Sequence, residues 1–287
     1  MEWAVTSPYS SAVDFAFTQR TPQGSLARYV ESIWHARGQI PYTRERIAPT
    51  GSTVAGIVLG APIRQIPDDG APFLAATGFL IGPHDRPIVN EPTAETHCVG
   101  IVTTPIGCRA VFGVDPAALR GRVVDLLAAW PAAAALRQDL LGVEDPERML
   151  AASEAALRSG LDESDRGLDR CAAAVAMLEA SPARPIGEVA AELGVSHGHL
   201  DREFTRVVGL SPRTLARVLR VRRLLERIDV SDRVAWTRLA ADLGWYDQAH
   251  LIRDVTRHTG VPPSAYVAAQ RRFLAPDDLT PGFVPGV

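Results

Sequence analysis

The sequence predicts two unlike halves: an α+β N-terminal domain, built as a small β-barrel or curled sheet followed by helices, and an all-α C-terminal domain. Short β-branched runs separated by Pro and Gly fill residues 1–110, whereas helical spacing of apolar residues begins near Pro116. One stretch of the helical half also occurs twice. At 287 residues the chain is long enough for two domains.

The expected elements of the N-terminal half follow the chain in order. Five β-branched runs mark strands at 46–48, 53–59, 79–81, 88–89 and 99–103. From Pro116 the spacing of Leu119, Val123 and Leu126 predicts a helix, and further helices follow at 131–141 and 146–159. The acidic stretch 161–168 predicts a flexible linker. We therefore expect an N-terminal domain at 1–160 (barrel 1–110, helices 116–160), a C-terminal domain at 169–275 and a tail at 276–287.

The C-terminal half contains one supersecondary unit twice. Five positions recur fifty or fifty-one residues later: Ala190 as Ala240, Gly194 as Gly244, Leu200 as Leu251, Gly209 as Gly260 and Pro212 as Pro263. Each copy predicts an amphipathic helix, a turn through Gly, and a second helix whose N-cap is Ser196 or Asp247. That is a helix-turn-helix, and two in tandem indicate a DNA-binding protein. The alternative, a structural solenoid, usually needs three or more units.

Residues 168–273 resemble the DNA-binding domain of the AraC/XylS family of bacterial transcription regulators. The first copy matches as A-x-x-L-G-V-S-x-x-x-L-x-R-x-F-x-x-x-x-G-x-S-P, and the second as L-A-x-x-L-G-W-x-D-Q-x-H-L-x-R-x-V-x-x-x-x-G-x-P-P-S-A-Y. The resemblance implies a seven-helix domain in which Pro212–Arg227 joins the two units. Val255 stands where the family has Phe, which implies a smaller core, and Gly198 replaces a larger residue at an exposed recognition position, which removes one base contact.

The same resemblance implies which side chains meet DNA. The base-reading positions fall on Asp201, Arg202, Gln248, His250 and Arg253. Arg can bind guanine with two hydrogen bonds, Gln can bind adenine in the same way, and Asp can accept from cytosine. A solvated helix face is the alternative for Asp201 and His250. Phosphate contacts, which set register, are expected from Ser196, Thr205, Arg206, Arg213, Arg217 and Arg257.

Charge distribution agrees with a nucleic-acid partner. The 30 basic residues are all Arg, and residues 181–273 hold 15 Arg against 10 Asp and Glu, a net of +5 that leaves −8 for the rest of the chain. The expected partner is double-stranded promoter or operator DNA. RNA polymerase, a small-molecule effector and a second copy of the chain stay open as further partners.

The sequence also predicts where the protein works. Its start lacks the basic and apolar segments of a signal peptide, and its longest apolar run, 54–63, is too short to span a bilayer. The cysteines Cys98, Cys108 and Cys171 are widely separated, which is typical of buried thiols in a reducing compartment. We expect a bacterial protein in the cytoplasm that makes no membrane contact.

The N-terminal half resembles a domain of unknown function that precedes AraC-type DNA-binding domains. The matching stretches are I-A-P-T-G-S-T-V-A-G-I-V-L (47–59), V-G-I-V-T-T-P-I-G-C-R-A-V-F-G-V (99–114) and L-R-G-R-V-V-D-L (119–126). This resemblance implies a cupin-like sensor barrel. Seven aromatic residues near the start could line a pocket, form a dimer interface or fill the core: Trp3, Tyr9, Phe15, Phe17, Tyr29, Trp34 and Tyr42.

Enzymatic chemistry in this half is not expected. The candidate metal ligands are His84, Glu91, Glu95 and His97, and they lack the His-x-His pair of metal-dependent cupins. We therefore expect no metal, no cofactor and no catalysis. The function expected is a sequence-specific transcription regulator controlled by an N-terminal domain that binds an effector or a partner. The alternative is a DNA repair or modification protein that uses the tandem units for targeting.

Overall fold

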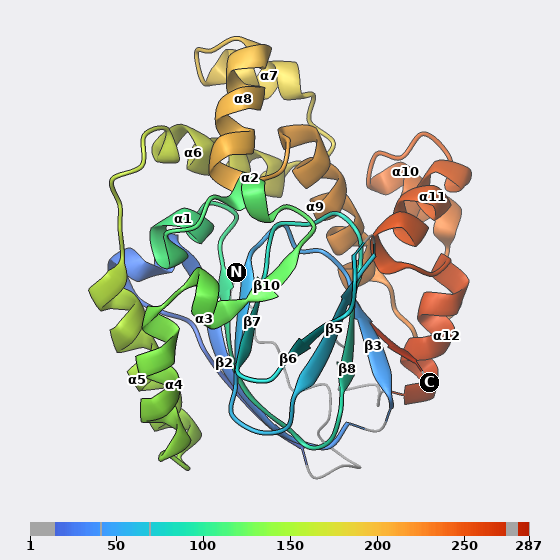
Figure 1. Cartoon of the computed structure of the whole chain (residues 1–287). Helices are drawn as coiled ribbons and strands as arrows, with labels where there is room; N and C mark the ends of the chain where they lie inside the picture. Colours follow the sequence, from blue (N-terminus) through green and yellow to red (C-terminus); the bar gives the residue numbers. More distant parts are fainter. Residues whose placement is uncertain (1–14, 41, 69, 274–280, 287) are drawn as a thin grey trace.

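The computed structural model describes residues 15–40, 42–68, 70–273 and 281–286. A β-rich domain whose strands form a barrel is followed by a helical domain that lies along one end and one side of the barrel (Figure 1). One sheet has, in spatial order, β1 (Phe15–Arg20), β2 (Val30–Gly38), β9 (Thr96–Thr103), β4 (Val54–Val58), β7 (Gly78–Ile81) and β10 (Val123–Asp125). The other has β11 (Phe283–Gly286), β3 (Arg44–Ile47), β8 (Ile88–Pro92), β5 (Ile63–Pro67) and β6 (Phe73–Ala75). The predicted fold class is confirmed.

Aromatic rings fill part of the space between the two sheets. The Trp34 indole lies over Gly100, where a Cβ atom would come within 2.0 Å of the ring, and Phe79 lies over Gly56 in the same way at 2.2 Å. Glycine is required at both positions because any side chain would displace a ring. Of the early aromatic residues, Tyr29 and Trp34 pack in the interior, whereas Trp3 and Tyr9 fall outside the described residues.

Polar side chains cross the opposite sheet in one row. Gln65, Asn90 and Glu45 are aligned by strand register. The Gln65 amide donates to Asn90 at 2.7 Å, and the Asn90 amide donates to Glu45 at 2.9 Å. The Glu45 carboxylate, which is 5% exposed, also accepts from the Tyr42 hydroxyl at 2.8 Å. The hydrogen bonds offset the cost of burying Asn90 and Glu45.

Two sequence expectations need correction at the barrel. Residues Val123–Asp125 form strand β10 and not part of a helix, because Val123 pairs with Ile81 and so extends the first sheet. The C-terminal segment is likewise not only a tail, since Phe283–Gly286 pairs with β3 as strand β11. Each of the five expected β runs does overlap a strand. Whether such a segment becomes an edge strand depends on a partner strand far away in the sequence, which the local pattern of residues does not reveal.

Helices surround the barrel and form the C-terminal domain. The barrel domain has a 3-10 turn at Gly24–Arg28 and helices α1 (Gly107–Phe112), α2 (Pro116–Leu119), α3 (Leu126–Ala129), α4 (Ala132–Leu141) and α5 (Pro146–Gly160). The C-terminal domain has α6 (Leu168–Ala180), α7 (Ile186–Glu192), α8 (His197–Val208), α9 (Pro212–Arg227), α10 (Trp236–Asp242), α11 (Gln248–Thr259) and α12 (Pro263–Phe273). These seven helices within the described residues are the number that the resemblance implied.

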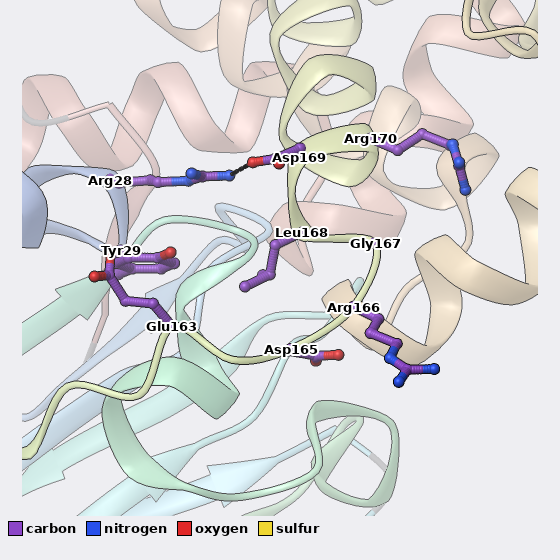
Figure 2. A pocket seen from close by; sticks show the side chains of 9 residues that line it. All are labelled: Arg28, Tyr29, Glu163, Asp165, Arg166, Gly167, Leu168, Asp169 and Arg170. Carbon is purple, nitrogen blue, oxygen red and sulfur yellow. Dashed lines mark hydrogen bonds and ion pairs between the residues drawn. The ribbon is translucent and has the colours of Figure 1, made fainter.

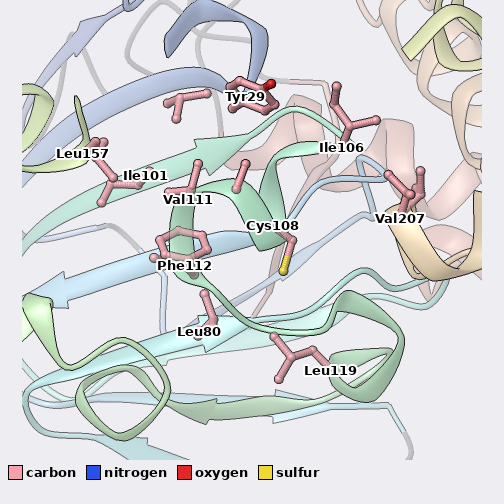
Figure 3. Close-up of a cluster of buried hydrophobic side chains, with 14 of the residues drawn as sticks. Tyr29, Leu80, Ile101, Ile106, Cys108, Val111, Phe112, Leu119, Leu157 and Val207 are labelled. Carbon is pink, nitrogen blue, oxygen red and sulfur yellow. The ribbon is translucent and has the colours of Figure 1, made fainter. Parts of the chain in front are cut away.

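The first helix-turn-helix unit shares its core with the barrel domain. Val207 of α8 lies in one apolar cluster with Leu119 of α2 and with Ile106 and Cys108 at the start of α1 (Figure 3). The second unit has a separate core around α9 and α11, which Ala48 and Val284 of the barrel domain complete. Both units therefore rest on the N-terminal domain.

The segment between the domains is held in place, which corrects the expectation of a flexible linker. The Asp162 backbone N–H donates to the Ala110 carbonyl at 2.9 Å. The Asp165 carboxylate, only 13% exposed, contacts Arg206 at 2.6 Å and Arg109 at 3.5 Å. The acidic composition of this segment predicted that its side chains would be exposed to solvent. Instead, the Asp165 carboxylate lies between an arginine of the barrel domain and an arginine of the helical domain.

Candidate nucleic-acid interface

The two helix-turn-helix units have the same local construction. The Ser196 hydroxyl caps α8 by accepting from the His199 N–H at 3.2 Å, and Asp247 caps α11 by accepting from the His250 N–H at 2.7 Å. Each cap satisfies one backbone donor that the helix itself leaves free. Ser196 was predicted to touch phosphate, and its oxygen is already engaged in this cap.

The turns of the two units also have the same backbone geometry. Gly194 and Gly244 adopt left-handed backbone angles, with φ of 68° and 80°. After each glycine a backbone N–H returns to the first helix: Val195 to Ala190 at 3.0 Å, and Trp245 to Ala240 at 2.8 Å. The repeat found in the sequence is therefore a repeat of structure.

Core packing differs between the units at the position where Val255 replaces a larger residue. In the first unit Leu200 and Phe204 are fully buried, and in the second Leu251 and Val255 are. Trp245 lies beside this second core, and its indole N–H donates to Asp254 at 2.8 Å. The buried Asp254 carboxylate is thereby satisfied.

The five side chains predicted to read bases divide by exposure. Arg202, Gln248 and Arg253 are exposed, whereas Asp201 and His250 are half-buried. The Gln248 amide oxygen accepts from the Thr237 hydroxyl at 3.2 Å, and His250 Nε2 lies 3.5 Å from Asp254. Arg202 and Arg253 occupy equivalent places in the two units, so they are the pair most readily available to a DNA groove.

Two of the predicted phosphate contacts are engaged with carboxylates. Arg206 pairs with Asp165 at 2.6 Å, and Arg257 pairs with Asp85 at 2.6 Å. Among the others, Arg213 is exposed, while Thr205 and Arg217 are half-buried. Each unit thus has one arginine held by a carboxylate from outside the helical domain.

The ion pair between Asp85 and Arg257 stabilises the ionised form of the Asp85 carboxyl. Burial opposes ionisation of this carboxyl, but hydrogen bonds from Arg257 and its positive charge outweigh burial and lower the pKa of Asp85 below its usual value. Both Nε and Nη2 of Arg257 donate to one Asp85 oxygen, at 3.2 and 2.6 Å. His258 Nδ1 lies 2.8 Å from the Asp85 carbonyl oxygen. These contacts fasten the β7–β8 loop (residues 82–87) to α11.

Sequence reasoning missed two residues beside these helices. Tyr246, directly before the Asp247 cap, is 93% exposed. The position of Tyr246 between two expected helices could have indicated this exposure. Arg86 of the β7–β8 loop lies in the same hollow as Arg253, and no feature of its local sequence indicated this.

A hollow of about 610 Å³ marks the junction between the domains (Figure 2). Its walls come from Arg28 and Tyr29 on one side and from Glu163 and residues 165–170 on the other. Arg28 binds Asp169 across it. The arginines and carboxylates that line it are balanced, so its charge favours neither an anion nor a cation.

The candidate metal ligands of the sequence are apart in the structure. His84 Nδ1 lies 2.9 Å from the Gly82 carbonyl, Glu91 pairs with Arg64, and Glu95 pairs with Arg37. The ring of His97 meets His35 edge-on. Within the described ranges, no group of three or more His, Cys, Asp or Glu residues is arranged to hold a metal ion.

The three cysteine side chains are buried and form no disulfide with one another. Burial raises the pKa of Cys98 to about 12 and that of Cys108 to about 11. At neutral pH both groups are therefore protonated and weakly nucleophilic.

No helix in the part of the chain that the structure describes has the length and apolar character needed to cross a membrane.

Comparison with known proteins identifies both halves. The family model described as "Helix-turn-helix domain" matches residues 189–269, and that described as "Domain of unknown function (DUF6597)" matches residues 18–125. No curated protein matches the chain. Among solved structures, ToxT from Vibrio cholerae is similar over 88% of this chain and 98% of its own, with 10% identity and a TM-score of 0.45.

Two further solved structures are similar at lower TM-scores. The AraC-like transcriptional activator CuxR matches over 74% of this chain and 87% of its own, with 14% identity and a TM-score of 0.25. An RmlC-like cupin protein from Desulfovibrio desulfuricans matches over 34% of this chain and 94% of its own, with 13% identity and a TM-score of 0.24.

Proposed function

We propose that this chain is a DNA-binding transcription regulator of the AraC type, and that it binds specific operator sequences with both of its recognition helices. In this proposal α8 and α11 enter adjacent major-groove segments, and the N-terminal domain binds an effector or a partner that controls them. The observation that carries the proposal is the duplicated unit, in which Arg202 and Arg253 hold equivalent exposed positions.

The roles of the side chains follow from their chemistry. Arg202 and Arg253 can each make two hydrogen bonds to guanine, and Gln248 can do so with adenine. Asp201 and His250 complete the proposed base-reading set. Phosphate contacts, which fix the register of the protein on the duplex, are assigned to Ser196, Thr205, Arg206, Arg213, Arg217 and Arg257.

Contacts between the domains support control by the N-terminal half. α8 shares a core with α1 and α2, and α11 is fastened to the β7–β8 loop by Asp85. An effector can shift DNA affinity only if it binds one arrangement of the domains better than another. The barrel domain is therefore the proposed site of regulation, by a small molecule, a second copy of the chain or RNA polymerase, and it performs no catalysis in this proposal.

The test is selection of bound sequences from random DNA, followed by a footprint on a selected fragment. We expect two protected major-groove segments on one face of the duplex, about 34 Å apart. Equal affinity for selected and random DNA would contradict sequence-specific regulation. Conversion of the DNA to a modified product would instead favour the repair or modification alternative.

A further inference from the structure

We propose that the N-terminal domain supplies a DNA contact of its own: Arg86, in the β7–β8 loop, binds a backbone phosphate beside the second recognition helix. This inference rests on the proposed function. It adds a residue from outside the helical domain to the DNA-binding surface, and it makes the barrel part of that surface.

The first observation is a hollow of about 660 Å³ between the loop and α11. Four arginines line it: Arg86 from the loop, Arg217 from α9, and Arg253 and Arg257 from α11. Arg253 is the exposed base-reading candidate. A phosphate next to the groove that Arg253 enters would therefore lie within reach of the side chains around this hollow.

Charge in the hollow is unbalanced. Its one lining carboxylate, Asp254, is 7% exposed and already accepts from the Trp245 indole. Asp85 neutralises only Arg257. Arg86 faces Asp68 with a separation of 3.8 Å between Nε and Oδ2, and both side chains are about two-fifths exposed. So long and exposed an ion pair is weak, which leaves Arg86 free to exchange a carboxylate for a phosphate.

The loop is held firmly enough to position Arg86. On one side of it, the Asp85 carboxylate and carbonyl bind Arg257 and His258 of α11. On the other side, Pro87 lies against the left-handed Gly260 that ends the same helix, where an added Cβ would come within 3.1 Å of the Pro87 ring. Arg86 is thus fixed between two anchored residues, and only its side chain has to adjust.

The start of the loop is anchored as well. Pro83 contacts Gly209, the residue that ends the first recognition helix. The Gly121 N–H donates to the Pro83 carbonyl at 2.9 Å. One short loop of the barrel therefore touches the C-terminal ends of both recognition helices, and these contacts position the barrel beside the DNA-binding surface in this structure.

The experiment measures affinity of the full-length chain for a selected operator and for random DNA over a range of salt. Arg86→Ala should weaken binding to both DNAs by about three- to tenfold and reduce the slope of log affinity against log salt by about 0.9, the value for one lost phosphate contact. Arg86→Lys should retain most of the slope, because a phosphate contact needs only a positive charge.

Arg64→Ala is the matched control. Arg64 is also on the barrel, is 50% exposed and faces a carboxylate at 3.5 Å, but it does not line the hollow. Its loss should change neither affinity nor slope. If Arg86→Ala behaves like Arg64→Ala, the proposal is wrong. Tighter binding by Arg86→Ala would also overturn it, by showing that the loop restrains the helices. If the unmodified chain prefers no sequence, the proposed function fails instead.

Discussion

Arg206 of α8, the first proposed recognition helix, pairs at 2.6 Å with Asp165, a residue that lies between the two domains. The same arginine also donates to the Arg166 carbonyl. Arg206 is a proposed phosphate contact, so Asp165 binds the same guanidinium group that would contact a DNA phosphate. In the proposed complex a phosphate replaces the carboxylate, so the free energy of the ion pair is subtracted from that of DNA binding.

Asp165→Asn should therefore strengthen binding to any DNA. Removal of the carboxylate charge leaves Arg206 available, and we expect an increase of about two- to fivefold, as for loss of a partly exposed ion pair worth up to roughly 1 kcal/mol. Titration of labelled operator and random duplexes measures it. Glu163→Gln, an exposed change of the same charge in the same segment, should have no comparable effect. Unchanged or weaker binding by Asp165→Asn would show that the pair does not compete with DNA.

Base reading and phosphate contact should separate in a pair of variants. Arg253→Ala should lower operator affinity by about 1–3 kcal/mol and relax preference at one base pair. Arg217→Ala should weaken all sequences alike and reduce the salt slope by about 0.9. Competition binding against single-base operator variants distinguishes these results. Arg148→Ala, an exposed position on α5, is the control. Equal losses on operator and random DNA for Arg253→Ala would exclude base reading at that residue.

The tandem units could be predicted because their determinants are local. The Ser196 and Asp247 caps each act on an N–H three residues away, and the glycine turns close over five. Strand β2 was missed because Glu31, His35 and Arg37 interrupt its apolar pattern. Its partner β1 is nearby in the sequence, but its other partner, β9, lies more than fifty residues away. Such pairing is decided by contacts that a local window does not contain.

The contacts between the domains could not be predicted from the sequence. Asp85 and Arg257 are 172 residues apart in the sequence. From its own local sequence, each is expected to be a charged side chain exposed to solvent. The acidic stretch 161–168 was expected to be flexible for the same reason. Its carboxylates gain arginine partners only after both domains have folded. The local structure of each helix-turn-helix unit was therefore predictable, but its connection to the barrel was not.

Two glycines test how strongly the first unit is docked on the barrel domain. Gly194 and Gly209 both have left-handed backbone, with φ of 68° and 81°. A Cβ at Gly194 would meet nothing within 4 Å, whereas one at Gly209 would lie 2.7 Å from the Pro116 carbonyl oxygen. Gly194→Ala should cost about 1 kcal/mol of unfolding free energy, the backbone penalty alone.

Gly209→Ala should cost more, by about 1–3 kcal/mol beyond the backbone penalty, because the barrel domain and α8 must separate slightly or strain. Denaturant unfolding of the two variants measures the difference. Equal losses of stability would mean that the contact between Gly209 and Pro116 contributes nothing to docking.

Acid should destabilise the barrel domain through His35. This residue is 2% exposed, and its ring centroid lies 5.3 Å from that of His97. Among the residues that the structure describes, neither of its ring nitrogens has a hydrogen-bond partner. Burial, with smaller contributions from the charges of His97 and Arg37, lowers the pKa of His35 from 6.5 to about 4. Between these two values the unfolded chain binds a proton that the folded chain does not. The free energy of unfolding therefore falls as the pH drops through this range.

From pH 7 to pH 5, this single group should lower the free energy of unfolding by about 2 kcal/mol. His35→Leu removes the titrating ring, so its unfolding free energy should fall by about 2 kcal/mol less than that of the unmodified protein over the same interval, whatever its stability at pH 7. Urea unfolding at the two pH values measures both falls. If the curves of the His35→Leu variant and the unmodified protein run parallel between pH 7 and pH 5, His35 is not the group that senses acid.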